Sequence, residues 1–424
     1  MLSKESKIDN KFKIFYHSVT NKINDSFVGL KIKNNKIDFY YPETYNFDDK
    51  ASIEENRKDI LEILNTISIA NSLSNPEAKI ESSYSNDNIL PLPSILWIIK
   101  DYLVNGLYIN RENVFEKNQK GKIDWKRTIN NQPMISNRNV IYKDIVVLNK
   151  NKLDNIIVDI HKYCVKKSID LFGWLFNINN SFFIETKPHT REIKKLYKEI
   201  LKKELHKTFN DFKKVRLTHL LNIIEGLDGE KNNEEIVYGV DKYSFIFEKM
   251  INYIFGNKKA NNYNPSANWF FEIENFTKPY KSSELRPDTI LEYENYTYII
   301  DSKFYRFGYT NDKSDLPKIS SIQKQITYGD YIKNNKLINS DKIRNIFILP
   351  YNKQKNSLNL SNNLEYIGFA KSDYRASKHK HEIIHTFLID LKYLINIWNN
   401  KKYHANIKDL IIKISNVENQ INKL

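Results

Sequence analysis

The sequence predicts a mixed α/β (α+β) fold whose C-terminal part is a mixed sheet flanked by helices. Segments with helical spacing of apolar residues alternate along the chain with short β-branched and aromatic segments. From residue 236 onward the order is helix, three strands, helix, strand, written here as αβββαβ. With 424 residues, the chain is long enough to build two or three domains.

Three regions can be separated. Residues 1–110 form an N-terminal α+β region, residues 111–235 a basic and mostly helical connecting region, and residues 236–424 the domain with the αβββαβ order. The first region begins with a hairpin predicted over residues 27–32 and 37–41. Helical spacing follows over residues 60–67 and 95–103. Nothing in this first region predicts a chemistry.

The connecting region is basic. Near its start, a compact basic and aromatic segment contains Lys122, Lys126 and Arg127, which are candidate DNA contacts. Later, apolar positions predict one long amphipathic helix over residues 190–212. Residues 185–216 hold 11 Lys+Arg against 5 Asp+Glu, so the polar face of this helix is suited to a phosphate backbone. A solvated helix face explains the same charges equally well.

The third region has the clearest order of elements. We expect helices over residues 243–255, 319–333 and 378–398, and strands over residues 269–274, 289–293, 296–300 and 343–349. The second and third of these strands flank a polar two-residue turn at Glu294-Asn295, so they are predicted to form a hairpin.

This hairpin is predicted to bring two carboxylates and a lysine close together. It places Asp288 beside Asp301, and because residues two apart on a strand share a face, Asp301 and Lys303 point the same way. Two converging carboxylates suit Mg²⁺, for which Mn²⁺ can substitute. A lysine beside that ion can offset charge on a reacting phosphate. The alternative is an ordinary solvated salt bridge between Asp301 and Lys303, since Asp-x-Lys alone is a common triplet.

Composition narrows the class of protein. The net charge of +15 favours a polyanionic partner, although a composition biased toward Lys, Asn, Ile and Tyr contributes to it. The single cysteine, Cys164, excludes an internal disulfide and a multi-cysteine zinc site, and it is expected to be buried. No signal peptide or membrane-spanning stretch is visible. We therefore expect a soluble, cytoplasmic protein without a membrane partner.

Motifs spread along the chain resemble the LlaJI family of restriction endonucleases. The matching segments are Gly121-Lys122-Ile123-Asp124-Trp125, Tyr238-Gly239, Phe247-Glu248-Lys249-Met250, Arg286-Pro287-Asp288, Asp301-Ser302-Lys303-Phe304-Tyr305, Gln325-x-x-Tyr328 and Tyr366-Ile367-Gly368. The αβββαβ order is similar to the PD-(D/E)xK nuclease core. The family is also similar to the nuclease subunit of McrBC-type systems, in which a separate AAA+ GTPase drives the nuclease.

The resemblance implies a role for each matching residue. Asp288, Asp301 and the main-chain carbonyl of Ser302 would hold the metal, and Lys303 would stabilise the transition state. The accessory acid would be Glu248. Supporting or DNA-facing roles fall to the remaining matches, Arg286, Gln325 and Tyr328.

The resemblance also implies partners. Double-stranded DNA would be the substrate, and an AAA+ GTPase and a cognate DNA methyltransferase would belong to the same restriction-modification system. A homodimer is compatible with this arrangement. The N-terminal region would then serve DNA recognition or partner binding.

Other functions compete with this one. One alternative is a RecB-like repair nuclease, which has the same fold. Another is a DNA-binding subunit whose vestigial site no longer cleaves DNA. His381-Glu382-Ile383-Ile384-His385 also fits a zinc-peptidase motif, in which two histidines four apart on a helix bind Zn²⁺. That site needs a third ligand, for which His404 or Glu418 is the candidate.

Overall fold

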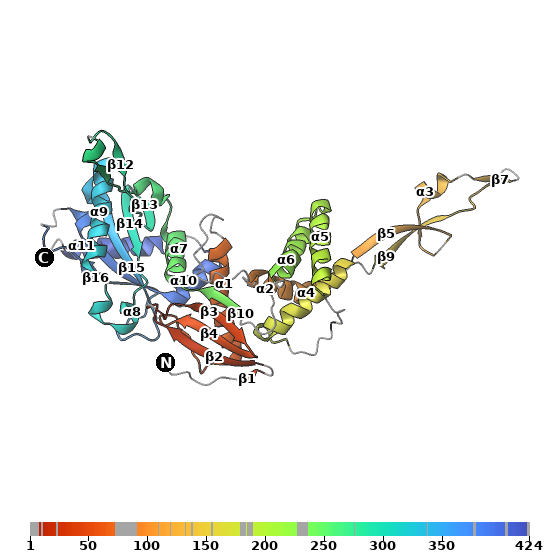
Figure 1. Cartoon of the computed structure of the whole chain (residues 1–424), viewed down its shortest axis with the longest axis horizontal. Coiled ribbons are helices and arrows are strands. Elements are labelled where there is room, and N and C mark those ends of the chain that lie inside the picture. Colours follow the sequence, from red (N-terminus) through yellow and green to blue (C-terminus); the bar gives the residue numbers. More distant parts are fainter. Residues whose placement is uncertain are drawn as a thin grey trace. The chain divides into compact units, whose positions relative to one another are not determined.

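The computed structural model divides the chain into two compact units, one of residues 1–86 and 233–424 (unit 1) and one of residues 87–232 (unit 2). The structure describes residues 8–9, 12–22, 24–72, 91–108, 110–118, 120–131, 133–136, 139–153, 156–178, 184, 190–226, 236–274, 276–336, 338–375, 379–402 and 406–421 (Figure 1). The predicted boundary at residue 110 lies inside unit 2. The first strands instead share a unit with the αβββαβ region.

The N-terminal sheet of unit 1 has the strand order β1-β2-β4-β3-β10. Its strands are β1 (Ile8–Asp9), β2 (Phe12–Val19), β3 (Val28–Lys33), β4 (Lys36–Pro42) and β10 (Ile236–Val240). β3 and β4 pair antiparallel, which confirms the predicted hairpin. In β10, Gly239 pairs with Gly29 of β3, where a Cβ atom on Gly29 would lie 2.2 Å from the Tyr238 carbonyl oxygen. Close approach of the two backbones therefore requires glycine.

The second sheet of unit 1 has the order β13-β14-β15-β17-β16. Its strands are β13 (Thr289–Tyr293), β14 (Tyr296–Ser302), β15 (Ile343–Tyr351), β16 (Leu364–Ala370) and β17 (Ile384–Asp390). β13 and β14 form the predicted hairpin, with positive φ at both turn residues, Glu294 and Asn295. β14, β15 and β17 run parallel. The connection from β14 to β15 includes α9 (Ile319–Lys336), as expected for a parallel crossover.

Helices cover this sheet. α7 (Tyr243–Phe255) packs against β13 and β14, and α9 packs against β14, β15 and β17 (Figure 1). The remaining helices of the unit are α1 (Ile53–Ser72), α8 (Phe307–Thr310), α10 (Leu391–Asn399) and α11 (Ile407–Ile421). Between α9 and the hairpin, Ile290, Ile299, Tyr328 and Ile332 form a buried cluster. The carboxylate-bearing strands therefore rest on a packed core.

Two predicted elements of unit 1 are wrong. Residues 378–398 are not one helix, because a 3-10 turn (Lys380–Glu382) and strand β17 precede α10. The strand predicted over residues 269–274 is β11 (Asn268–Phe270) followed by a 3-10 turn (Glu272–Glu274). β11 pairs with β12 (Pro279–Lys281) in a separate two-stranded ribbon, so it is not the first strand of the αβββαβ sheet.

Unit 2 combines helices with small sheets (Figure 1). Its helices are α2 (Leu92–Asn105), α3 (Trp125–Ile129), α4 (Ile156–Phe172), α5 (Arg191–Lys207) and α6 (Asp211–Gly226). Its strands are β5 (Asn110–Lys117), β6 (Lys122–Ile123), β7 (Met134–Ser136), β8 (Asn139–Ile141) and β9 (Val146–Leu153). The helix predicted over residues 190–212 is interrupted after Lys207, because the Asn210 side chain accepts a hydrogen bond from the Lys213 N–H and begins α6. Cys164 is buried, as predicted.

No helix in the described ranges is both long enough and apolar enough to cross a bilayer.

Candidate active site

The β13–β14 hairpin brings Asp288 and Asp301 together. Asp288 directly precedes β13, whose first residue, Thr289, pairs with Ile300, the residue before Asp301. The main-chain N–H of Ser302 donates to Oδ2 of Asp288 at 2.8 Å. This hydrogen bond therefore connects the last residue of β14 to the carboxylate that directly precedes β13.

Lys303 completes the cluster. Its Nζ lies 2.5 Å from Oδ2 of Asp301, and the two side chains are 15% and 2% exposed. Apart from this ammonium, neither carboxylate oxygen of Asp301 has a hydrogen-bond partner among the described residues. A buried carboxylate with unused lone pairs is unfavourable unless its charge is compensated. The site therefore has the capacity for a further positive charge.

The pKa values of the surrounding groups also indicate an excess of negative charge at this site. Burial, followed by the charges of Asp301 and Glu248, raises the pKa of Asp288 to about 8. Burial and the charge of Asp301 also raise the pKa of Glu248, which lies on α7. Although burial opposes it, the Asp301 carboxylate raises the pKa of Lys303. The charges of Lys303 and Lys324 offset this only in part, and a further cation would relieve the repulsion among the three carboxylates.

The donor set fits Mg²⁺ better than an ion that needs a complete protein cage. Among the residues that the structure describes, no three His, Cys, Asp or Glu side chains converge to hold a metal. Mg²⁺ commonly takes only one or two carboxylates and completes its shell with water and phosphate oxygens. Asp288 and Asp301, whose Oδ1 has no hydrogen-bond partner among the described residues, match that requirement.

Gln325 and Tyr328 fix the two carboxylate-bearing segments to α9. The Gln325 amide donates to the Ile299 carbonyl on β14 at 2.7 Å, and the Tyr328 hydroxyl donates to the Arg286 carbonyl at 2.6 Å. Both side chains are 0% exposed. Both side chains bond main-chain carbonyls inside the fold, and neither is exposed on the surface of this structure. The side chain of Arg286 is exposed.

The three basic candidates of the connecting region lie in the other unit. Lys122, Lys126 and Arg127 are all exposed on unit 2, whereas Asp288, Asp301, Lys303 and Glu248 belong to unit 1. The Asp124 side chain accepts a hydrogen bond from the Arg127 N–H at the start of α3. The Arg127 guanidinium lies 3.3 Å from the centroid of the Phe115 ring. That segment is therefore an exposed basic and aromatic surface.

The zinc-peptidase motif does not form a zinc site. His381 lies in a 3-10 turn and His385 on β17, so the two histidines do not share a helix face. Nε2 of His381 lies 2.9 Å from Asp330, while Nε2 of His385 lies 3.7 Å from Glu418. Glu418 also bonds Arg344, and His404 lies outside the described residues. The zinc-peptidase alternative is therefore wrong.

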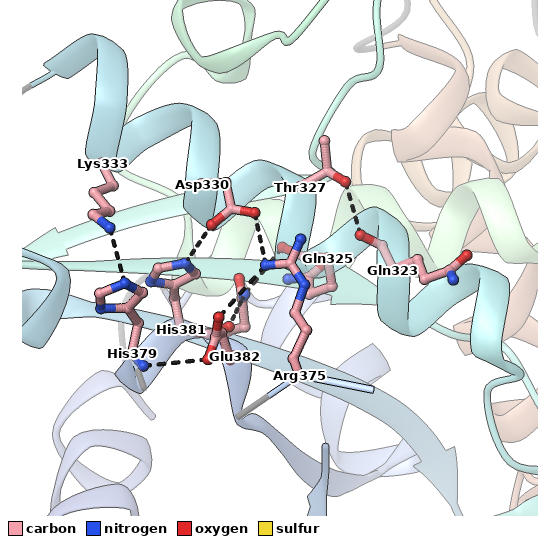
Figure 2. Close-up of polar contacts among 10 residues, drawn as sticks. Gln323, Gln325, Thr327, Asp330, Lys333, Arg375, His379, His381 and Glu382 are labelled. Atoms are coloured by element: carbon pink, nitrogen blue, oxygen red, sulfur yellow. Dashed lines mark hydrogen bonds and ion pairs between the residues drawn. The ribbon is translucent and has the colours of Figure 1, made fainter. Parts of the chain in front are cut away.

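His381 instead belongs to a polar cluster between α9 and the turn before β17 (Figure 2). Arg375 lies 3.0 Å from Asp330 and 3.5 Å from Glu382, and Lys333 bonds His379 at 2.9 Å. Gly329 allows the close contact, since a Cβ atom there would lie 2.5 Å from Cδ2 of His381. The cluster anchors the helix that also carries Gln325.

One supporting residue was missed in the sequence. Asn345 is fully buried on β15, and its amide donates to the Gln325 carbonyl on α9 at 3.0 Å. The available signal was an asparagine directly before the apolar segment Ile346-Phe347-Ile348-Leu349. Such a residue needs a buried partner.

Comparisons with known proteins identify the family of this chain. A component of the type II restriction enzyme BsuMI, YdjA of Bacillus subtilis (strain 168), is 24% identical over 281 residues, which are 62% of this chain and 58% of that protein. The chain thus spans less than two thirds of that relative. A solved complex of Thermococcus gammatolerans McrB AAA+ hexamers with bound McrC matches 88% of this chain and 81% of that chain, with 14% identity and a TM-score of 0.39. The family model of the LlaJI restriction endonuclease matches residues 27–390, so the chain belongs to the LlaJI restriction endonuclease family.

Proposed function

We propose that the chain is the Mg²⁺-dependent nuclease subunit of a restriction system and hydrolyses phosphodiester bonds of double-stranded DNA. The observation that carries this proposal is the cluster of buried Asp301 with the partly buried Asp288 and Lys303 at the ends of two paired strands. Membership of a restriction endonuclease family supports the reaction class. The site would be of the PD-(D/E)xK type.

Each residue has a role in this proposal. Asp288, Asp301 and the main-chain carbonyl of Ser302 would hold the ion. Bound Mg²⁺ supplies a Lewis acid that lowers the pKa of water and offsets phosphate charge. Lys303, fixed by Asp301 at 2.5 Å, provides positive charge where negative charge develops on the phosphate. Glu248 adds to the negative potential that attracts the cation.

DNA affinity would come mainly from charge. The chain carries a net charge of +15, and each phosphate contact adds roughly 0.9 to the log–log dependence of affinity on salt. Lys122, Lys126 and Arg127 are exposed and available for such contacts. Binding that does not weaken with salt would count against this electrostatic mode.

A separate AAA+ GTPase subunit would drive the nuclease, and a cognate DNA methyltransferase would protect the host DNA. No Gly-x-x-x-x-Gly-Lys-Ser/Thr loop occurs in these 424 residues, so this chain does not supply a nucleotide-hydrolysing motor of that type. The name of the Bacillus relative, a restriction enzyme component, supports a system of several subunits. The nuclease would work within that assembly, and a homodimer is compatible with it.

Plasmid cleavage tests this proposal. Closed circular DNA is incubated with Mg²⁺ and the chain alone, with the proposed AAA+ GTPase subunit of the same system, or with that subunit and GTP. We expect weak cutting by the chain alone and strong cutting only in the complete reaction. Efficient site-specific cutting without partner or nucleotide would contradict the two-component system, and faster degradation of linear than circular DNA would indicate a repair nuclease instead.

A further inference from the structure

We propose that the β11–β12 ribbon stacks on unpaired nucleobases of the DNA that lies in the nuclease site. The ribbon belongs to unit 1 and spans Asn268–Phe270 and Pro279–Lys281. This inference rests on the proposed function and adds the form of the substrate to it: DNA with a locally unpaired stretch.

Three exposed aromatic rings lie together: Trp269 and Tyr280 on the ribbon, and Phe271 directly after its first strand. Trp269 pairs directly with Tyr280 across the ribbon, and the rings of Trp269 and Phe271 are stacked, with centroids 6.4 Å apart and an interplanar angle of 13°. Trp269 is 60% exposed, Tyr280 is 65% exposed and Phe271 is 41% exposed. Rings of this size are normally buried to a large extent. A cluster left in solvent marks a binding surface.

The ribbon continues directly into the nuclease site. Beyond its paired strands, the N–H groups of Ser282 and Leu285 donate to the carbonyls of Ala267 and Pro265 at 2.7 and 2.9 Å. Leu285 is followed by Arg286, whose carbonyl is held by Tyr328, and then by Asp288. At about 3.3 Å per residue, Tyr280 lies within roughly 26 Å of Asp288 along the chain. That span is about eight nucleotides at about 3.4 Å each, so the rings could reach bases near the cut.

The tip of the ribbon keeps an aromatic residue in an unfavourable conformation. Phe276 has φ of 56° and is 58% exposed. Among the described non-glycine residues with positive φ, the others are asparagines, Glu294 and Lys401. Asparagine tolerates this region of φ far better than a bulky side chain does. A strained phenylalanine that buries little surface indicates that its ring has a function outside the fold.

The position of the ribbon beside the nuclease site, together with two lysines, favours DNA over a protein partner. Lys278 and Lys281 flank Tyr280 and both are exposed, and Lys281 pairs with Glu284 at 2.5 Å. Glu272 and Glu274 balance the remaining positive charge of residues 268–286. Lysine is depleted from the centres of protein–protein interfaces, whereas sites for single strands combine basic residues with aromatic rings. Bases inside an intact duplex already stack on their neighbours. The exposed rings therefore fit bases that have lost a stacking partner.

The first test measures DNA binding by the full chain in the absence of divalent cations. The probes are a fluorescein-labelled duplex and the same duplex with a central unpaired bubble, followed by anisotropy. The combined Trp269→Ala, Phe271→Ala and Tyr280→Ala variant should bind the bubble about tenfold or more weakly and the duplex within about twofold. Trp269→Phe with Tyr280→Phe should retain bubble binding, because both rings remain.

The matched control is Phe369→Ala on β16, at the opposite edge of the sheet from β13, where the ring is 43% exposed. It should change neither affinity. Unchanged bubble affinity in the triple variant, or an equal loss on both probes, would overturn the inference. A change in oligomeric state of the triple variant would also overturn it, because the ribbon would then be a contact between copies.

The second test uses Phe276→Asn. We expect its melting temperature to equal or exceed that of the wild type while bubble affinity falls about fivefold. A lower melting temperature with unchanged affinity would show that the ring serves the fold. A failure of the proposed nuclease function would be detected separately. If that function were wrong, Asp301→Asn would cleave DNA like the wild type. The bubble-binding test does not depend on this result, because it is carried out without cleavage.

Discussion

The side-chain amide of Gln325 donates to the main-chain carbonyl of Ile299 at 2.7 Å, two residues before Asp301 on β14. Gln325 lies on α9 and is fully buried, and Asn345 of β15 in turn binds its carbonyl. One buried helix residue therefore connects the two strands at the centre of the sheet. The position of the Asp301 carboxylate depends on this connection.

Replacing Gln325 by Leu should impair cleavage without removing a group that touches DNA. The change removes the buried hydrogen bond to the Ile299 carbonyl, which costs about 0.5–1.5 kcal/mol of stability. A shift of β14 should then lower kcat about tenfold and leave KM nearly unchanged. Steady-state cleavage and thermal melting measure both effects. The control is Gln323→Leu, exposed on the same helix, and equal losses in the two variants would show that the effect is not specific to this hydrogen bond.

Replacing His381 and His385 by Gln should preserve Mg²⁺-dependent cleavage and lower the melting temperature. His381 is buried against Gly329 and bonds Asp330, while His385 lies near Glu418, so the loss falls on packing and ion pairing. Zinc content by atomic absorption should be the same in wild type and variant. Stoichiometric zinc in the wild type that disappears in the variant would restore the peptidase interpretation.

Unit 2 should lose stability in acid through His161. Burial, followed by the charge of Arg216, lowers the pKa of His161 to about 4, and its Nδ1 accepts a hydrogen bond from the Tyr108 N–H at 2.8 Å. Because the folded pKa lies below the ordinary value, the stabilisation is present above about pH 6.5 and is lost as the pH falls through about 4. The loss is roughly 2–3 kcal/mol.

Melting curves between neutral pH and pH 4 measure this dependence. His161→Gln should flatten it, whereas His206→Gln, at an exposed position, should leave it unchanged. A wild-type curve that is flat over this interval would contradict the assignment.

Local patterns were sufficient to predict that Asp288 and Asp301 lie close together. The β13–β14 hairpin joins neighbouring segments through a two-residue turn, so alternation and turn chemistry predicted its register and hence the approach of Asp288 to Asp301. β17 was mistaken for helix because it is buried on both faces. All seven residues of β17 are buried, His385 and Thr386 included, so the strand shows no apolar–polar alternation, and its apolar residues are compatible with a buried helix.

Pairings between strands far apart in the chain could not be predicted from the sequence in this way. β10 joins β3 across about 200 residues, and no local pattern specifies that pairing. β11 has strand composition, yet its partner is β12 rather than the sheet. The buried hydrogen bonds of Gln325 and Tyr328 depend on such packing, so the sequence does not indicate their partners.

The cleavage rate of Lys303→Ala, measured with Mg²⁺ under conditions in which the wild type cuts, tests the central claim most directly. Lys303 is held 2.5 Å from Asp301 and would stabilise the transition state rather than the bound duplex. The rate should fall by roughly a thousandfold or more while DNA affinity stays within a few-fold, and exposed Lys318→Ala should cut like the wild type. Wild-type cutting by Lys303→Ala would contradict the assignment of this cluster as the nuclease site.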